Sequence, residues 1–321
     1  MPVTISHVPT NIISGFLGVG KTTAILSLFE QKRLDDQRAG ENWAILVNEF
    51  GKVGIDGRIY EAQGIAVREI PGGCMCCAQG LPLQVAVNRL LREAQPDRLI
   101  IESSGVGHPA GVLKTLGGDD FKHVLKLQAG ICLVDPEQLL QPAYQDNELF
   151  KEQLLYADVL VANKTDLASV RAMRAFTELV ESYSPQKVLT ASTVNAHLDP
   201  RWLVLPHRRR DKTVFSSLSA PAVAQSDAVW QTRTLRFSED SRIDLNMLQD
   251  CLRQAGLQRA KGLLQTEDGC KLINYHPGHF EDQPFQACRE DDGRKNYLEV
   301  IGAADEISRF EDCLGQTVPI V

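Results

Sequence analysis

A glycine-rich segment that ends in lysine and threonine stands near the amino terminus, directly after a short apolar run. It reads Gly15-Phe16-Leu17-Gly18-Val19-Gly20-Lys21-Thr22 and fits the pattern G-x-x-x-x-G-K-[ST]. Glycines at these positions let backbone N–H groups close around phosphate oxygens, and the lysine supplies a positive charge. The threonine hydroxyl is suited to ligate Mg²⁺. The segment therefore predicts a nucleoside triphosphate site made by Gly15, Gly18, Val19, Gly20, Lys21, Thr22 and Thr23.

A second motif, Asn163-Lys164-Thr165-Asp166, follows the apolar residues 159–162 and has the form N-K-x-D. The carboxylate of Asp166 is able to accept hydrogen bonds from both the N1–H and the 2-amino group of guanine. Adenine lacks this pair of donors and would leave the desolvated carboxylate unpaired. The two motifs together predict that the chain binds GTP and GDP, with Asn163, Lys164 and Asp166 in the base site.

Two segments with acidic residues follow predicted strands that lie between these motifs. One is Asn48-Glu49-Phe50-Gly51, and the other is Glu102-Ser103-Ser104-Gly105. Loops at the carboxyl edge of a parallel sheet are able to reach the γ-phosphate. We expect Glu102 to lie near Mg²⁺ and to act in catalysis with Lys21 and Thr22, and Gly105 to sense the γ-phosphate through its backbone. The alternative for Glu49 and Glu102 is an ordinary charge in a loop.

Three of the eight cysteines form the cluster Cys74-Met75-Cys76-Cys77. Soft thiolates favour Zn²⁺, Cu⁺ or Co²⁺ over Mg²⁺ or Ca²⁺. Neighbouring side chains diverge in an extended chain, so we expect two or three thiolates, completed by water or by a residue such as Glu49. A redox pair or buried thiols are the alternative. The other cysteines, at positions 132, 251, 270, 288 and 313, are predicted to be reduced core residues.

Three histidines are candidates for further metal ligands. His108 follows the segment that begins at Glu102, where it is either a ligand or proton relay or simply a solvated loop residue. His276 and His279 flank Pro277-Gly278 with a spacing that suits a metal ion, although a turn is the simpler account.

Apolar segments alternate with amphipathic ones over the first 200 residues, as in a doubly wound, mostly parallel α/β sheet. The predicted strands are 10–14, 43–47, 65–70, 98–101, 130–134, 159–162 and 187–189, and the predicted helices are 21–31, 81–94, 147–156 and 169–182. These elements place the phosphate, base and cysteine motifs after strand ends, which predicts one shared edge of the sheet.

A smaller domain is predicted after a linker. Residues 205–227 lack periodicity and include the basic cluster His207 to Arg210, which is either a solvated linker or an anion patch. Strands are predicted at 230–237, 259–265, 271–275 and 297–301, and helices at 243–254 and 305–314. This order indicates a ferredoxin-like α+β domain. The predicted division is thus 1–204, 205–227 and 228–321.

Composition narrows the classes of partner. The chain has 321 residues, a formal net charge of −7, 43% apolar residues and 23% charged residues. A folded protein is indicated, and the acidic balance disfavours nucleic acid and anionic membranes as partners. No run approaches the roughly 20 apolar residues of a membrane helix. We therefore expect a cytoplasmic protein, for which a homo-oligomer stays open.

These motifs, in this order, resemble the CobW-type metal-handling P-loop GTPases. The Arg259-Ala260-Lys261-Gly262 segment resembles part of that family's C-terminal domain. Within the family the chain is most similar to the YeiR zinc-binding group, on the strength of Val47-Asn48-Glu49-Phe50-Gly51 and of Gly72 to Cys77 with Gly80-Leu81-Pro82. The resemblance implies slow GTP hydrolysis and a metal site coupled to the nucleotide. Lys52 stands where many members have glutamate, so no role for a carboxylate carries over to that position.

Three functions are candidates for this chain. The first is a metallochaperone GTPase that holds Zn²⁺, Co²⁺ or another transition metal and delivers it to a client metalloprotein. The second is a metal or redox sensor without delivery. The third is a P-loop kinase, which Asn163 to Asp166 disfavours. Because the sequence defines no glutamine or arginine finger, the intrinsic turnover is expected to be slow.

Overall fold

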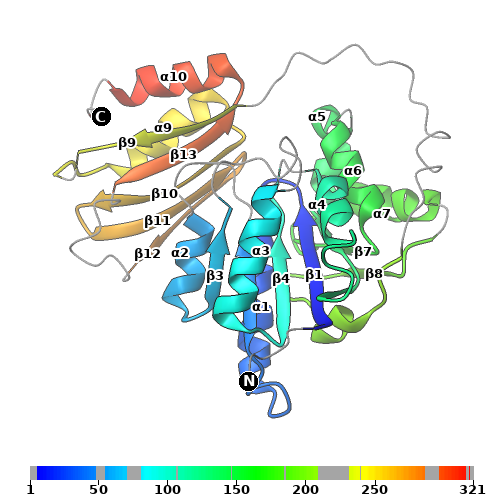
Figure 1. Cartoon of the computed structure of the whole chain (residues 1–321). Coiled ribbons are helices and arrows are strands. Elements are labelled where there is room, and N and C mark those ends of the chain that lie inside the picture. Colours follow the sequence, from blue (N-terminus) through cyan, green and yellow to red (C-terminus); the bar gives the residue numbers. More distant parts are fainter. Residues whose placement is uncertain are drawn as a thin grey trace. The chain divides into compact units, whose positions relative to one another are not determined.

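The computed structural model describes residues 6–47, 55–70, 81–105, 108–145, 147–183, 186–208, 231–238, 240–285, 296–315 and 318. The chain divides into two compact units, one made of Met1–Phe50 with Asp56–Asp211 and the other of Gly51–Ile55 with Lys212–Val321. Each unit carries its own sheet (Figure 1). The predicted boundaries at 204/205 and 227/228 stay predictions.

The first unit is built on a parallel sheet with the strand order β3-β2-β4-β1-β6-β7-β8, and β5 pairs with β1. The strands are β1 (Val8–Gly15), β2 (Trp43–Val47), β3 (Ala66–Glu69), β4 (Arg98–Glu102), β5 (Leu125–Leu127), β6 (Ile131–Val134), β7 (Val159–Ala162) and β8 (Leu189–Ser192). Strands β2, β4, β6 and β7 are buried along their whole length, as expected for a sheet covered on both faces.

Helices cover this sheet and connect its strands (Figure 1). They are α1 (Lys21–Leu34), α2 (Ile55–Ala62), α3 (Leu81–Ala94), α4 (Pro109–Leu116), α5 (Pro142–Gln145), α6 (Glu148–Tyr156) and α7 (Val170–Ser182), with the 3-10 turns η1 (Pro136–Leu140) and η2 (Pro200–Val204). Polar side chains begin several of them, since Asn147 caps α6 and Ser169 caps α7 through hydrogen bonds to backbone N–H groups.

The predicted strand at 187–189 lies instead at Leu189–Ser192. Residues 187 and 188 belong to the loop that precedes this strand. The Lys187 ammonium donates to the carbonyl oxygens of Leu154, Leu155 and Ala157 at the end of α6, at 2.5, 3.0 and 2.9 Å. The elements α2, α4, α5 and β5 were not predicted, because each has eight residues or fewer and is too short for its pattern to repeat over several turns.

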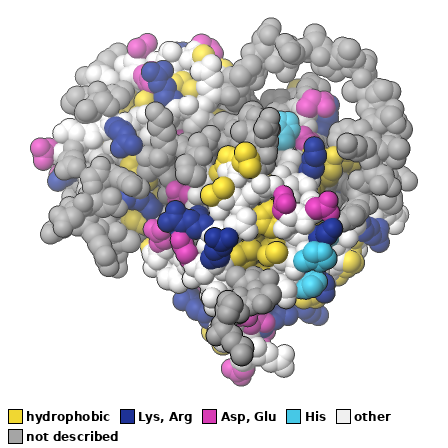
Figure 2. Space-filling model, viewed as in Figure 1, with side chains coloured by type: hydrophobic (Ala, Val, Ile, Leu, Met, Phe, Trp, Pro, Cys, Tyr) yellow, Lys and Arg dark blue, Asp and Glu magenta, His cyan; other side chains and the backbone are white. Residues whose placement is uncertain are grey.

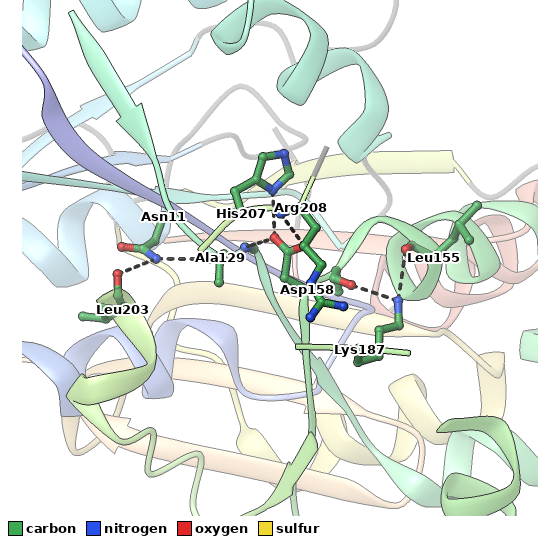
Figure 3. A network of polar contacts seen from close by, with 10 residues as sticks. Asn11, Ala129, Leu155, Asp158, Lys187, Leu203, His207 and Arg208 are labelled. Carbon is green, nitrogen blue, oxygen red and sulfur yellow. Dashed lines mark hydrogen bonds and ion pairs between the residues drawn. The ribbon is translucent and has the colours of Figure 1, made fainter. Parts of the chain in front are cut away.

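The first residues of the predicted linker are held against the sheet by a buried carboxylate (Figure 3). Asp158, at the start of β7, accepts hydrogen bonds from the His207 ring at 2.8 Å, the Arg208 backbone N–H at 3.1 Å and the Gly130 N–H at 2.9 Å. The Asp158 side chain has no exposed surface. His207 and Arg208 are therefore part of the first unit's packing rather than a solvated tether.

The second unit is an antiparallel sheet covered by two helices. The strands β9 (Gln231–Arg236), β10 (Arg259–Thr266), β11 (Gly269–His276), β12 (His279–Pro284) and β13 (Tyr297–Gly302) have the order β12-β11-β10-β13-β9. Helices α9 (Leu245–Ala255) and α10 (Ala304–Gly315) supply Leu248, Leu252 and Phe310 to its core. β9 and β10 flank β13 with α9 between them in the chain, which is the split β-α-β arrangement predicted for a ferredoxin-like domain.

The prediction that all scattered cysteines are reduced is wrong for one pair. Cys251 of α9 and Cys313 of α10 form a disulfide that joins the two helices. Their positions lie 62 residues apart in the chain, and only the packing of α9 on α10 brings their Cα atoms to 5.8 Å. Cys132 is a free thiol in the core of the first unit, where burial raises its pKa to about 11.

The surface is mixed in charge. Acidic and basic side chains are interspersed among the coloured residues on the face shown in Figure 2. Within the described ranges, no helix has the length and apolar character needed to cross a membrane.

Candidate nucleotide site

The segment between β1 and α1 has the backbone conformation of a phosphate-binding loop. Gly15, Gly18 and Gly20 all have positive φ, of 139°, 72° and 96°. A Cβ atom at Gly15 would lie 2.5 Å from the Leu133 carbonyl oxygen, so no larger residue fits there. Gly20 precedes the first turn of α1 without any side-chain cap. The N–H groups of that turn are thus oriented toward an anion in front of the helix.

Lys21 is nearly buried at the start of α1, with 8% of its surface exposed. Its ammonium group donates to the carbonyl oxygens of Gly15 at 2.8 Å and Phe16 at 3.0 Å. These contacts hold the positive charge inside the loop that encloses the phosphates. The geometry agrees with the predicted role of Lys21 as the cation beside the transferred phosphoryl group.

Side chains of neighbouring elements donate hydrogen bonds to the phosphate loop and to the segment after β4. Gln138 of η1 donates to the Leu17 carbonyl oxygen at 2.9 Å, and Gln153 of α6 donates to the Gly105 carbonyl oxygen at 3.0 Å. Gly105 lies so close to the loop that a Cβ atom there would be 2.6 Å from the Leu17 side chain. The segment after β4 is therefore in direct contact with the phosphate loop. Phe16 packs edge-on against the rings of Tyr144 and Phe150.

Oxygen atoms suited to Mg²⁺ converge beside the loop. Glu102 is the last residue of β4, not the first residue after it, and is 3% exposed. The Thr22 hydroxyl donates to Glu102 Oε1 at 3.1 Å, and the Tyr60 hydroxyl donates to Glu102 Oε2 at 2.6 Å. A hydroxyl and a carboxylate next to a phosphate loop are the ligand types that Mg²⁺ prefers. Thr22 and Glu102 thus fit the ion, which when bound supplies charge neutralisation at the β- and γ-phosphates.

The base end of the site is tied to the phosphate end by Asn163. Its side chain donates to the Val19 carbonyl oxygen at 2.8 Å and accepts from the Ala196 N–H at 2.8 Å. Asn163 is 2% exposed, so this bridge is shielded from water. Lys164 forms an ion pair with Asp135 at 3.1 Å and has a positive φ of 59°. Asn163 and Lys164 therefore organise the loops of this end of the site, and their contacts with the base stay a prediction.

Two of the residues predicted to bind the nucleotide have exposed side chains. Asp166 and Thr23 are exposed, one in the loop after β7 and the other in the first turn of α1. A carboxylate in this position is accessible to the guanine donors predicted for it. The contacts of Asp166 with a nucleotide stay a prediction.

Sequence reasoning missed the loop after β8, which completes the base end. The Thr193 carbonyl oxygen accepts from the Thr165 hydroxyl at 3.1 Å, and Ala196 contacts Asn163 as described above. Asn195 and Ala196 have positive φ values of 52° and 55°, an uncommon conformation for residues other than glycine. Their place after the next parallel strand was the available signal. Tyr60 was missed because α2 was not predicted.

The comparisons with known proteins agree with this geometry. Residues 9–190 match the model of the CobW/HypB/UreG nucleotide-binding domain. The chain belongs to the CobW/HypB/UreG family. It is 37% identical over 285 residues to the zinc chaperone YeiR of Escherichia coli K12, covering 83% of this chain and 85% of that protein.

Two further proteins are similar to this chain. The zinc chaperone CobW of Sinorhizobium sp is 29% identical over 208 residues, which cover 56% of this chain and 57% of that protein. The crystal structure of the Zn(II)-bound YjiA GTPase from E. coli is 17% identical and has a TM-score of 0.42, with 97% of this chain and 98% of that one covered.

Membership of the CobW/HypB/UreG family confirms the resemblance drawn from the motifs, and it makes this chain a P-loop GTPase. Lys21 contacts the phosphate loop at Gly15, and Thr22 contacts Glu102. Their individual contributions to GTP hydrolysis are predictions.

The predicted transition-metal ligands Glu49, Cys74, Cys76 and Cys77 lie outside the described residues. His108 is half exposed and its ring contacts Glu152 of α6 at 2.5 Å. His276 and His279 face each other across a β-hairpin with ring centroids 4.9 Å apart, which agrees with the turn interpretation. Within the described part of the chain, no three His, Cys, Asp or Glu residues form a group that would hold a metal ion.

Proposed function

We propose that this GTPase is a zinc metallochaperone in which the nucleotide cycle controls a metal ion held by the Cys-x-Cys-Cys loop. Cys74, Cys76, Cys77 and Glu49 are the proposed ligands, and Zn²⁺ is the proposed cargo, with Co²⁺ as a second candidate. The zinc chaperone names of YeiR and CobW support the choice of metal. A client metalloprotein would receive the ion.

The observation that carries this proposal is the register of neighbouring strand ends. Glu69 at the end of β3 pairs with Val47 at the end of β2, and Val47 pairs in turn with Glu102 of β4. Glu102 is also the partner of Ile13 in β1, two residues before the phosphate loop begins. Strands lie about 4.8 Å apart, so Glu69 is about 10 Å from Glu102 across the sheet.

This register places the departure points of two segments next to the Mg²⁺ side of the nucleotide site. The segment with Glu49 follows Val47 directly, and the segment with the cysteines begins two residues after Glu69. Movement at the γ-phosphate and movement at the metal ligands would therefore act on adjacent strand ends. Such proximity supports a coupling free energy between the two ligands.

Helix α2 supports the same coupling. It follows the segment that contains Glu49, and its Gly57 lies against the carboxylate of Glu69, where a Cβ atom would be 1.9 Å from Oε1. One turn later, Tyr60 of α2 donates to Glu102. The same face of one short helix thus contacts both the strand end that leads to the cysteines and the carboxylate beside Thr22.

In the proposed cycle, GTP brings Glu49 and the cysteine loop together around the ion, and hydrolysis releases it. Lys21 and the backbone N–H groups of the loop would stabilise the charge on the transferred phosphoryl group, and Mg²⁺ held by Thr22 and Glu102 would supply further positive charge there. GTP must then tighten metal binding, and the metal must tighten GTP binding by the same factor.

The test is the affinity for Zn²⁺ and Co²⁺ by competition titration of nucleotide-free, GDP-bound and GTP-analogue-bound protein. We expect the analogue to tighten binding by about 5- to 150-fold, the usual range of allosteric coupling. The double variant Cys76→Ser/Cys77→Ser should lose stoichiometric metal and the coupling, but keep the affinity for GTP that the wild type has in the absence of metal. The control Cys270→Ser changes a cysteine of β11 and should behave like the wild type. Equal affinities in all three nucleotide states would reject the gated carrier.

A sensor is the alternative function, and release distinguishes it from a carrier. Zn²⁺-loaded protein is supplied with GTP and a chromogenic chelator that is too weak to remove the ion unaided. Release at the rate of GTP hydrolysis supports a chaperone. Retention of Zn²⁺ throughout hydrolysis supports a sensor.

A further inference from the structure

A buried tyrosine on α2 contacts the carboxylate beside the Mg²⁺ ligand Thr22. The Tyr60 side chain has no exposed surface, and its hydroxyl lies 2.6 Å from Glu102 Oε2. Short hydrogen bonds from a hydroxyl to a carboxylate are among the strong ones in proteins. We propose that Tyr60 is a positioning residue of the nucleotide site, which orients the Glu102 carboxylate so that Thr22 and Glu102 are able to hold Mg²⁺ with the nucleotide.

The division of the two carboxylate oxygens carries the argument. The Tyr60 hydroxyl donates to Oε2, and the Thr22 hydroxyl donates to Oε1 at 3.1 Å. A donor on Oε2 restricts rotation of the carboxylate and keeps Oε1 turned toward Thr22. In this orientation Glu102 accepts a hydrogen bond from the Thr22 hydroxyl, whose oxygen would be available to hold Mg²⁺.

The fold makes this orientation depend on a tyrosine at this position. Tyr60 and Glu102 are 42 residues apart and belong to α2 and β4, which are not consecutive in the chain. The backbone carbonyl of Tyr60 accepts from the N–H groups of Gln63 at 3.0 Å and Ile65 at 3.1 Å, which close the end of α2. The ring is therefore held at both its backbone and its hydroxyl, so the phenol is preorganised rather than drawn in by the ligand.

This role rests on the GTPase activity and not on the proposed metal cargo. It predicts a defect that appears only when Mg²⁺ is present. Tyr60→Phe keeps the buried ring and removes one donor to a charged group, a change of the order of tenfold in the equilibrium it affects. We expect the Mg²⁺ concentration for half-maximal tightening of fluorescent GDP to rise about tenfold. The affinity for GDP in the presence of EDTA should stay within about twofold of the wild type.

Two further variants separate positioning from a general loss of stability. Tyr275→Phe removes a hydroxyl that donates to the Leu252 carbonyl oxygen at 3.4 Å in the second unit. It should leave the Mg²⁺ dependence unchanged. Glu102→Gln alone should weaken the Mg²⁺ effect, and Tyr60→Phe should add little in that background, because the tyrosine acts through the carboxylate.

Binding of fluorescent GDP is measured over a range of Mg²⁺ concentrations for all four proteins and the double variant. A tenfold shift in Tyr60→Phe that disappears in the Glu102→Gln background supports the role. An unchanged Mg²⁺ dependence in Tyr60→Phe would overturn it, as would additive effects of the two substitutions. Equal weakening of GDP binding with and without Mg²⁺ would also overturn it, since the tyrosine would then support only the fold.

Discussion

Replacement of Asn163 by alanine should uncouple the base end of the nucleotide site from the phosphate end. The Asn163 amide is the bridge between the Val19 carbonyl oxygen and the Ala196 N–H, both at 2.8 Å. Val19 belongs to the phosphate loop, and Ala196 belongs to the loop after β8. Without the amide, these two loops lose their shared buried partner.

The expected magnitude follows from the two hydrogen bonds. Each contributes about 0.5–1.5 kcal/mol net, and a buried group left without its partner costs about 1–3 kcal/mol. Asn163 is only 2% exposed, so water cannot easily replace its amide group as a hydrogen-bond partner. We expect the free energy of unfolding to fall by about 2–4 kcal/mol. The nucleotide must then align two loops that were prealigned, and a weakening of GDP binding of about 10- to 100-fold corresponds to about 1.4–2.7 kcal/mol.

Asn11→Ala is the matched control. Asn11 is also a fully buried amide, and it donates to the carbonyl oxygens of Ala129 at 3.0 Å and Leu203 at 3.1 Å (Figure 3). It lies in β1 four residues before Gly15, away from the phosphate loop. Asn11 Oδ1 also accepts from the buried Arg98 guanidinium at 2.7 Å. We therefore expect a loss of stability at least as large as in Asn163→Ala, with a change in GDP affinity of no more than about twofold.

The assay pairs chemical denaturation with titration of fluorescent GDP, performed below the temperature at which either variant unfolds. If Asn163→Ala binds GDP as tightly as the wild type, the bridge has no role in preorganising the site. If Asn11→Ala weakens binding to the same extent, the loss reflects global stability, and the reasoning from the bridge fails.

Two more predictions concern the nucleotide itself. Asp166→Asn should make the affinities for GTP and ATP converge, because the carboxylate that accepts guanine's two donors is lost; competition binding checks this, and comparable binding of both nucleotides by the unchanged protein would contradict it. Lys21→Ala should lower the hydrolysis rate at saturating GTP by at least roughly 10²-fold, because the charge beside the β- and γ-phosphates is removed. Phosphate release measures that rate, and near-normal turnover would show that the loop is not the catalytic cradle.

The outline of both domains was accessible from the sequence because it depends on local patterns. The segments 43–47 and 159–162 are short and apolar throughout, and both are buried parallel strands with the predicted bounds. The helix at 81–94 was also predicted with its observed limits, since its apolar residues recur at helical spacing. Short elements such as α2 and β5, with eight and three residues, were not predicted because so few positions do not define a period.

The disulfide and the contacts of the predicted linker could not be predicted from local patterns in the sequence. Nothing near Cys251 or Cys313 in the chain indicates a partner, and the pairing follows from two helices that share one face of a sheet. The basic cluster His207 to Arg210 lies in the segment that the sequence predicts to be a linker. Its first residues bind Asp158, a contact that spans 49 residues between the His207 ring and the carboxylate.

The sequence by itself determined the nucleotide chemistry and the family. The phosphate loop and the N-K-x-D motif are contiguous, so their residue types and spacing carry the chemistry without knowledge of the fold. Only the tertiary structure decided which residues support them. Tyr60 reaches Glu102 across 42 residues because α2 lies beside the end of β4. Ala196 reaches Asn163 across 33 residues because the carboxyl ends of the parallel strands β7 and β8 meet at one edge of the sheet. Contacts of this kind depend on strand order and register, which no short stretch of sequence contains.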